Sequence, residues 1–224
     1  MNYKRYYSSR GNYLKEHSHY FSKKRTNEDL EFIINVLKLK KKDKILDLAC
    51  GHGRHTIGLA RRGFNVDGLD FSGYLLRLAK KEARRNNLKV DFYQQDIHGI
   101  RLKPKYEKIF LFFADFGLFD AEKVFRNVTK ILRKNGLFLL DCDNVFRLVK
   151  HLTVHHHSPY VFDFMKMELR EKNQKGQGIK YYTFPELVRL LSQFGFRVVS
   201  VFGSYKKEPL SIDSKRMIII ARKG

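Results

Sequence analysis

Residues 45–53, Ile-Leu-Asp-Leu-Ala-Cys-Gly-His-Gly, form the segment of the chain best suited to binding a ligand. A strand-like apolar run passes into a turn that contains Gly51 and Gly53, and a helical stretch begins at Arg54. Glycines let the backbone come close to a ligand, and the start of a helix offers N–H groups that have no intrahelical partner. The segment therefore predicts a site for a nucleotide-like ligand.

Three carboxylates at successive predicted strands narrow the class of ligand. Asp47 lies four residues before Gly51, where a negative charge suits a cationic ligand better than a pyrophosphate. Asp70 ends the second strand, where its two oxygens can accept from both hydroxyls of a ribose. Asp96 follows the third strand and has Ile97 beside it, a pair that can contact an adenine. The three are expected to converge on one ligand. The alternative for Asp47 is a strand-end acid that accepts from backbone N–H groups.

A dinucleotide is the first alternative ligand. The fingerprint G-x-G-x-x-G of NAD-binding proteins requires a third glycine, and Thr56 stands at that position. Asp70 alone does not distinguish the two ligand classes, because NAD enzymes also place an acid about 20 residues past their glycines. The pattern therefore disfavours an NAD-dependent oxidoreductase.

The elements that must position these residues alternate between strand and helix. A capping box at Thr26–Asp29 opens a first helix, and Ser72 and Asp120 cap later ones, the last of which ends at Asn135-Gly136. The predicted strands cover residues 44–50, 65–70, 90–93, 108–113 and 137–142. Such alternation predicts a parallel, doubly wound α/β sheet. A helix after Thr183 precedes two strands, 197–202 and 216–221, whose connecting loop is too short for a crossover helix, so this pair is expected to be antiparallel.

Three segments, in this order and spacing, are similar to those of class I S-adenosylmethionine-dependent methyltransferases. They are Asp-Leu-Ala-Cys-Gly-His-Gly-Arg (47–54), Gly-Leu-Asp-Phe-Ser (68–72) and Gln-Gln-Asp-Ile (94–97). The resemblance covers residues 28–142 strongly, and the last 40 or so residues are similar to the closing helix and β-hairpin of the same family. It implies a Rossmann-like, seven-stranded sheet that is mostly parallel with the last strand antiparallel, and it implies S-adenosyl-L-methionine as cofactor.

The same resemblance assigns cofactor contacts to individual residues. Gly51 and Gly53 would lie under the methionine part, with Asp47 near its ammonium group. Asp70 would hold the ribose hydroxyls and Phe71 would pack on the adenine, although Phe71 is alternatively a core residue. The complete expected cofactor-binding set is Asp47, Ala49, Gly51, Gly53, Asp70, Phe71, Asp96 and Ile97.

The acceptor side of the site is expected just after the fourth strand, at Phe113–Gly117. Methyl transfer from a sulfonium is an in-line displacement, so the protein mainly holds donor and acceptor at near-attack distance. A base is needed only for an acceptor that is protonated at the working pH. Asp115 is the candidate catalytic residue, and its alternative is an acid that caps a turn. The Asp/Asn-Pro-Pro-Tyr motif, common where this fold methylates exocyclic amines of bases, is absent from this position.

Composition excludes several classes of protein. The chain has 224 residues with 45 Lys and Arg against 23 Asp and Glu, a net charge of +22. No apolar run approaches the about 18 residues of a membrane helix, and no apolar leader opens the chain. Two cysteines cannot build a disulfide scaffold. A cytoplasmic protein with no membrane partner is expected.

The ends of the chain carry more positive charge than the middle. The net charge is +6 on residues 1–25, +7 on 26–143 and +9 on 144–224. Residues 1–25 interleave aromatic and basic residues, so they are expected either to close over the cofactor as a lid or to bind RNA through phosphates and stacking. Residues 26–224 are expected to form the methyltransferase domain, in which 144–182 is expected to cover the acceptor pocket with Phe162, Phe164, Met165 and Met167.

The preferred function is methyl transfer from S-adenosylmethionine to a small molecule. Transfer to tRNA or rRNA is the alternative within the same class, favoured by the charge of +22. A non-catalytic RNA- or protein-binding module that keeps the fold is the alternative from another class, and it would bind cofactor without turnover. His155, His156 and His157 are consecutive and have no acidic or Cys cluster beside them, so no metal site is expected there.

Overall fold

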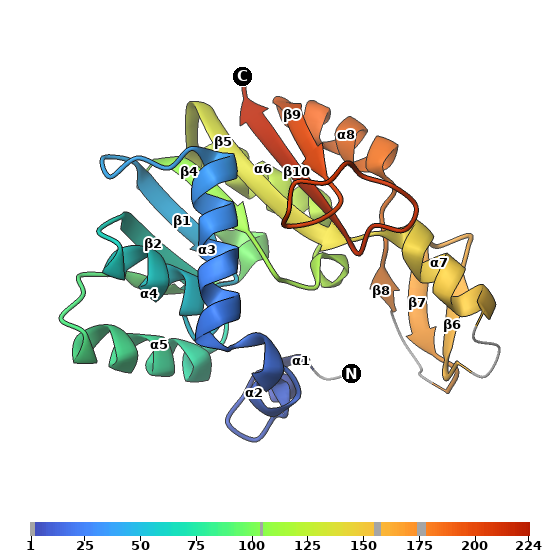
Figure 1. The fold of residues 1–224 in the computed structure, drawn as a ribbon, viewed down its shortest axis with the longest axis horizontal. Coiled ribbons are helices and arrows are strands. Elements are labelled where there is room, and N and C mark those ends of the chain that lie inside the picture. The colour runs from blue at the N-terminus through green and yellow to red at the C-terminus, as the bar shows by residue number, and fades with distance from the viewer. Residues whose placement is uncertain (1–2, 104, 155–157, 174–177) are drawn as a thin grey trace.

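The computed structural model describes residues 3–103, 105–154, 158–173 and 178–224 (Figure 1). Its main sheet has seven strands in the order β3-β2-β1-β4-β5-β10-β9. These are β3 (Phe92–Gln94), β2 (Asn65–Asp70), β1 (Lys44–Leu48), β4 (Tyr106–Leu111), β5 (Leu132–Asp143), β10 (Arg216–Lys223) and β9 (Phe196–Phe202). The first five are parallel, and β10 runs antiparallel to both of its neighbours. The predicted doubly wound sheet with an antiparallel last strand is confirmed.

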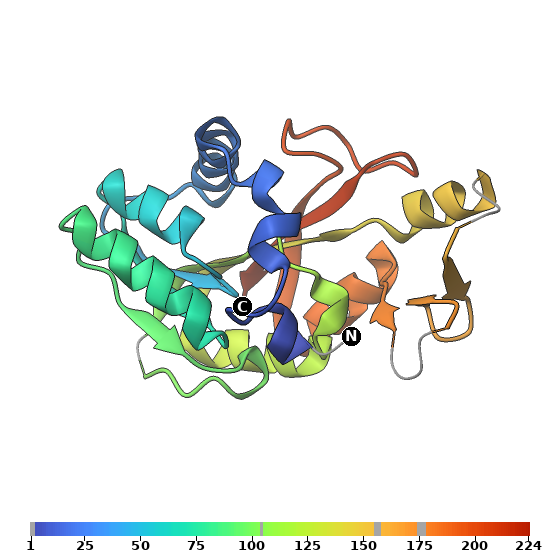
Figure 2. The same ribbon diagram turned by 90° about the horizontal axis from the view of Figure 1, so that it is seen from below.

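Helices cover both faces of this sheet (Figures 1 and 2). One layer contains α3 (Lys23–Leu37) and α4 (Arg54–Arg61), and the opposite layer contains α6 (Ala121–Ile131) and α8 (Phe184–Gln193). Helix α5 (Gly73–Arg85) packs beside α4 and β3. Alternate residues of β1 face the two helical layers. Ile45 packs in the core on the side of α3, and Leu46 packs in the core on the side of α6.

The helix starts show which capping signals were correct. Ser72, Asp120 and Thr183 each accept a hydrogen bond from the backbone N–H three residues later, as their positions predicted. The capping box at Thr26–Asp29 was wrong. Helix α3 begins one turn earlier, because the Ser22 hydroxyl accepts from the Arg25 N–H, and this leaves Thr26 and Asp29 inside the helix.

The boundary between α6 and β5 also differs from the expected one. The helix ends at Ile131 and β5 begins at Leu132, so the predicted stop at Asn135-Gly136 lies inside the strand. Asn135 adopts a left-handed φ of 61°, and the pairing of β4 with β5 shifts register between Tyr106 and Lys108. The turn-forming residues thus mark an irregularity within a strand rather than a helix end.

Residues 144–182 contain regular elements that the sequence did not predict. Helix α7 (Val145–Val154) follows β5, and β6 (Tyr160–Asp163), β7 (Glu168–Glu171) and β8 (Ile179–Lys180) form a three-stranded antiparallel sheet. We call α7 and β6–β8 the side lobe; it extends from the carboxyl end of β5 (Figure 1). His155, His156 and His157 lie outside the described residues.

The N-terminal segment lies across the carboxyl ends of the strands (Figure 2). It contains α1 (Tyr3–Tyr6), α2 (Tyr13–Glu16) and a 3-10 turn η1 (Ser18–Tyr20).

Within the described part of the chain, no helix has the length and apolar character needed to cross a membrane.

Asp29 joins α3 to the start of α4. Its fully buried carboxylate pairs with Arg54 Nη1 at 2.6 Å and with Arg25 Nε at 3.2 Å, and it lies 3.3 Å from His55 Nε2. Burial favours a raised pKa for Asp29, but the hydrogen bond from His55 and the charge of Arg54 outweigh it, and the pKa lies below its usual value. Burial lowers the pKa of His55 to about 4, so this histidine is neutral.

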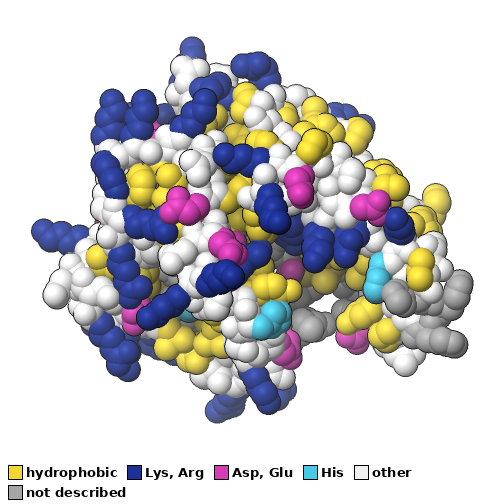
Figure 3. Space-filling model, in the orientation of Figure 1, with side chains coloured by type: hydrophobic (Ala, Val, Ile, Leu, Met, Phe, Trp, Pro, Cys, Tyr) yellow, Lys and Arg dark blue, Asp and Glu magenta, His cyan; other side chains and the backbone are white. Residues whose placement is uncertain are grey.

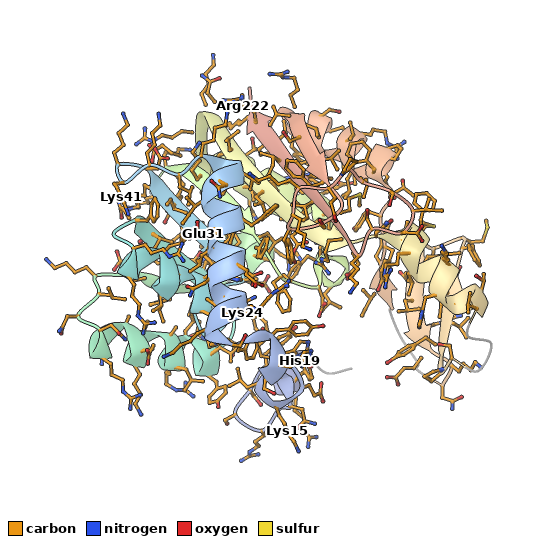
Figure 4. The ribbon with its side chains drawn as sticks, viewed as in Figure 1. Lys15, His19, Lys24, Glu31, Lys41 and Arg222 are labelled. Carbon is orange, nitrogen blue, oxygen red and sulfur yellow. The ribbon has the colours of Figure 1, made fainter. Side chains whose placement is uncertain are left out.

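Replacing Asp29 is expected to destabilise the fold strongly. Asp29→Ala leaves the guanidinium of Arg54, only 9% exposed, without its anion, and breaking a buried pair in this way costs about 3–5 kcal/mol. Glu31→Ala is the matched control on the same helix, because Glu31 is 63% exposed where it pairs with Arg62 (Figure 4), and it should cost less than about 1 kcal/mol. Urea unfolding of both variants measures the difference; equal losses would contradict the assignment.

Candidate functional site

A cavity of about 700 Å³ lies at the carboxyl ends of β1, β2 and β4, beneath the N-terminal segment. Nine residues were expected at the site, counting the candidate catalytic acid. Seven of them line the cavity: Ala49, Gly51, Asp70, Phe71, Asp96, Ile97 and Asp115. The other two, Asp47 and Gly53, lie behind its wall.

The two glycines of the loop after β1 have different roles. Both adopt left-handed φ values, 57° at Gly51 and 79° at Gly53. A Cβ on Gly51 would meet only the Tyr13 hydroxyl and Leu75 at 3.8 Å or more, so this backbone is open to the cavity. A Cβ on Gly53 would lie 2.9 Å from the Cβ of Ala79, so Gly53 permits the start of α4 to pack against α5.

Asp47 lies beneath the glycine loop rather than at the cavity surface. Its side chain is almost completely buried, and Oδ2 accepts a hydrogen bond from the Thr56 hydroxyl at 2.6 Å. Burial raises the pKa of Asp47 to about 7, against the opposing effect of the Thr56 hydrogen bond. In the sequence analysis Thr56 served only to disfavour an NAD site. In the structure it is the hydrogen-bond partner of the buried Asp47 carboxylate.

Asp70 joins two loops at the cavity wall. Its Oδ2 accepts from the Gly51 N–H and its Oδ1 accepts from the Ser72 N–H, both at 2.8 Å. Burial raises the pKa of Asp70, while these backbone hydrogen bonds favour the charged form. Each carboxylate oxygen can accept a second hydrogen bond.

The third carboxylate is more exposed than the other two. Asp96 caps the short 3-10 helix η2 (Ile97–Gly99) and accepts from the backbone N–H of His98 at 2.9 Å. The neighbouring Ile97 is buried and gives the wall an apolar surface. Phe71 is 36% exposed, so it is not a core residue. Its ring meets that of Tyr7 edge-on, with the ring centroids 5.5 Å apart.

Aromatic side chains of the N-terminal segment form the cavity wall opposite the sheet. Tyr7, Tyr13, His17 and Tyr20 line it. The segment is attached to the sheet by the Ser72 hydroxyl, which donates to the Tyr7 carbonyl at 2.6 Å, and by contact of the Tyr20 and Phe113 rings. Lys15 points away from the cavity into solvent (Figure 4).

Asp115 lies in a loop that is held by a buried network. Phe113, just after β4, has a left-handed φ of 59°, and its N–H donates to Asp141 at 3.0 Å. Asp141 also accepts from the Tyr205 hydroxyl and from Arg216 Nε. The Asp115 side chain is exposed to the cavity, and within the described ranges no hydrogen bond or ion pair reaches its carboxylate. Burial first, and then the charge of Asp115, raise the pKa of Tyr7 on the facing segment.

Sequence reasoning missed two charged residues of the cavity, Asp143 and Arg216. Their side chains pair with one another, and Arg216 also pairs with Asp141 at 2.8 Å. Asp143 follows the pattern of an acid at a strand end, which could have identified it. Arg216 could not be found in this way, because only the antiparallel pairing of β10 with β5 brings it to this edge.

The side lobe does not cover this cavity. None of its described residues lines the cavity, and β8 touches the 3-10 turn η3 (Phe116–Leu118), whose Leu118 lines it. The described part of the chain contains no group of three His, Cys, Asp or Glu side chains arranged to hold a metal ion.

Comparison with known proteins finds a methyltransferase domain in this chain. Residues 45–136 match the family model for a methyltransferase domain. A putative methyltransferase of Geobacillus sp. is 23% identical over 208 residues, which are 80% of this chain and 84% of that protein. A glycine/sarcosine N-methyltransferase of Parasynechococcus marenigrum is 26% identical over 212 residues, 82% of this chain and 73% of that protein.

A solved structure shares the fold along almost the whole chain. The S-adenosylmethionine-dependent methyltransferase from Clostridium acetobutylicum has a TM-score of 0.76 and 20% identity, over 95% of this chain and 99% of that chain. The matched domain contains the glycine loop, Asp70 and Asp96, the segments on which the resemblance rests. The matched residues 45–136 therefore form a methyltransferase domain, and the chain as a whole is similar to S-adenosylmethionine-dependent methyltransferases, which take a methyl group from that cofactor.

Proposed function

We propose that this enzyme transfers the methyl group of S-adenosylmethionine to a small molecule whose nucleophile lies beside Asp115. One observation carries the proposal: a single cavity is lined both by the residues expected to bind the cofactor and by the Asp115 carboxylate, which has no partner among the described residues. Its volume, about 700 Å³, is within the range of pockets that bury small ligands.

The residues present fit the cofactor. The open backbone at Gly51 gives room for the methionine part, and the free acceptor positions of Asp70 suit ribose hydroxyls. Phe71 and Ile97 offer apolar surface to the adenine, with Asp96 at its edge. Ala49 would complete the wall, while Asp47 and Gly53 would act from behind it by charge and by packing.

The chain's own groups would orient the acceptor and handle its proton. Bound S-adenosylmethionine supplies a methyl group on a positively charged sulfur. With the cofactor bound, the lone pair of the acceptor would take the methyl group as the carbon–sulfur bond breaks, and the sulfur would lose its positive charge. Asp115 accepts a hydrogen bond from the acceptor and takes its proton where the acceptor carries one.

The charges of the cavity favour a neutral or cationic small molecule. Among the described residues that line it, four are aspartates and one is an arginine, and that arginine is already paired with Asp141 and Asp143. A phosphate entering this space would meet mainly negative charge. The relative named glycine/sarcosine N-methyltransferase agrees with a small acceptor.

An RNA acceptor is the second candidate. It is favoured by the net charge of +22 and by the Lys and Arg side chains spread over the face seen in Figure 3. In this alternative the polymer would lie on the outer surface, and one base would enter the cavity.

The N-terminal segment, residues 1–25, would act as a lid on the domain formed by 26–224. Its aromatic residues line the cavity, and Tyr7 is attached to Ser72 by one hydrogen bond. Exchange of cofactor would require this contact and the ring contacts around it to open. Residues 144–182, which the sequence predicts to be a cap, would then contribute only to the rim of the acceptor pocket.

Cofactor affinity is expected to depend on Asp70. Asp70→Asn should weaken S-adenosylmethionine binding about ten- to a hundredfold, because hydrogen bonds that involve a charged group contribute about 1.5–3 kcal/mol. Asp67→Asn is the control: this buried acid on the same strand accepts from the Tyr106 hydroxyl and lies outside the cavity, so affinity should stay unchanged. Isothermal titration measures both. Heat with NAD but none with S-adenosylmethionine would overturn the cofactor assignment.

Cofactor binding is expected to release a proton below pH 7. The free protein holds a proton on Asp47 up to about pH 7, whereas a nearby ammonium group stabilises the ionised form and lowers this pKa. Affinity should therefore rise by up to about tenfold per pH unit between pH 5 and 7 and level off above. Titration at pH 6 in two buffers of different ionisation enthalpy measures the proton. Asp47→Asn should abolish its release, and a wild-type protein that releases none contradicts the proposed contact.

The acceptor class is expected to appear in a labelling experiment with cell extract. Tritium from labelled S-adenosylmethionine should enter the small-molecule fraction, and Asp115→Asn should lower the rate about 10²–10⁴-fold for an acceptor that loses a proton. Asp120→Asn, the helix cap five residues away, is the control and should keep the rate. Label in RNA, with binding that weakens steeply with salt, would support the second candidate. Cofactor binding without any labelled product would indicate a non-catalytic module.

A further inference from the structure

Large hydrophobic side chains are exposed mainly on the side lobe. Among the described residues nine such side chains are exposed, and six of them lie between positions 146 and 165. The six are Phe146, Val154, Tyr160, Val161, Phe164 and Met165; because Tyr160 and Val161 are neighbours in β6 and point to opposite sides of it, we call Tyr160, Phe164 and Met165 the apolar face. Hydrophobic side chains are visible on this lobe at the right of Figure 3. A concentration of exposed apolar groups in one part of a molecule marks an interaction site.

The most exposed of these residues, Met165, is held together with Phe164 in an ordered turn. Phe164 and Met165, which are 66% and 95% exposed, form the tip of the hairpin between β6 and β7. The Asp163 carboxylate accepts from the backbone N–H groups of Met165 and Lys166, both at 3.1 Å. The turn therefore presents two apolar side chains to solvent in a fixed arrangement.

A small groove continues the apolar face toward α7. Its volume is about 220 Å³, and it lies between α7 and β6. Val149, Leu152 and Phe162 line it together with Phe164 from the hairpin tip. The lobe thus offers both a projecting apolar tip and an apolar recess beside it.

Basic side chains border the apolar face. Lys166 follows Met165 in the turn, Lys172 lines the groove, and Arg147 and Lys150 are exposed on α7. Among the described residues of the lobe, six Lys and Arg side chains stand against three acids, Asp163, Glu168 and Glu171, so the lobe carries a net positive charge. Apolar side chains surrounded by Lys and Arg, on a chain of charge +22, match a surface that is apolar inside and negatively charged outside.

We propose that the side lobe docks on the surface of an anionic phospholipid membrane, with Phe164 and Met165 inserted among the lipids. Lys166 and Lys172 would contact the headgroups. A second copy of this chain fits less well, because each copy would bring the same positive charges to the contact. The proposal concerns a peripheral contact, and in this respect it revises the expectation from the sequence that the protein has no membrane partner.

Docking in this way would place the cavity close to the membrane. The side lobe and the cavity both lie at the carboxyl end of the parallel strands, and β5 leads directly from Asp143 at the cavity to α7 (Figure 1). The contact would not use the residues that line the cavity, so it is separate from cofactor binding.

Vesicle flotation tests the proposal with the full chain. The protein should float with vesicles that contain phosphatidylglycerol and bind vesicles of pure phosphatidylcholine at least about tenfold more weakly. The double variant Phe164→Asp, Met165→Asp should lose at least about tenfold in binding, because two apolar side chains no longer insert. The control Lys80→Ala, Lys81→Ala changes the net charge by the same two units on exposed residues of α5, and it should bind almost as well as the unaltered chain.

A single tryptophan can report insertion directly, because the chain contains none. Met165→Trp should shift its fluorescence to shorter wavelength with anionic vesicles and be quenched by brominated lipids, whereas Lys81→Trp should show neither effect. Several results would overturn the proposal: no flotation, equal binding to neutral vesicles, or unchanged binding by the double Asp variant. A shift in the Met165→Trp variant that depends on protein concentration without vesicles would instead assign the face to a second copy, and a partner found only among acidic proteins would exclude the membrane.

Discussion

Buried carboxylates at the carboxyl ends of parallel strands determine where the loops of this site lie. A carboxylate removed from water requires hydrogen-bond donors, and the donors available at this edge are largely backbone N–H groups of the loops. Asp70 takes them from Gly51 and Ser72, and Asp141 takes one from Phe113. Satisfying each acid therefore fixes the loop beside it, and the cavity is the space that these fixed loops enclose. Asp29 does the same from α3 by holding Arg54 at the start of α4.

Local signals in the sequence were sufficient to predict most helices and strands. They failed where a contact between residues far apart in the sequence determines the structure. Ser72, Asp120 and Thr183 act through backbone groups three residues away, so their helices were predicted correctly. The pattern at Thr26–Asp29 satisfied a capping box, yet Asp29 is used by residues of α4 that are 25 positions away. The side lobe was missed for a related reason: its strands are two to four residues long, and most of their apolar side chains are not buried.

Strand geometry explains which site residues the sequence located well. Asp70 and Asp96 lie at or beyond the ends of their strands, where side chains reach the common edge of the sheet. Asp47 lies inside β1, paired with Gly68 and Phe110, and it shares a face with Ile45; the pleat therefore directs it to Thr56 on α4. Tyr7, Tyr13 and Tyr20 come from a segment outside the sheet. Its aromatic composition was visible in the sequence, but which side faces the cavity depends on tertiary packing.

The distribution of charge separates what the outer surface can do from what the cavity can do. Most of the excess of Lys and Arg belongs to the two ends of the chain, whereas the charged residues that line the cavity are mainly aspartates. Exposed charges act over about 10 Å in salt, so the outer surface attracts negatively charged surfaces or polymers. Within the cavity, Arg216 is already compensated by Asp141 and Asp143, and it adds little attraction for an anion. A net charge of +22 therefore bears on where the enzyme is held, and the cavity lining bears on which molecule it methylates.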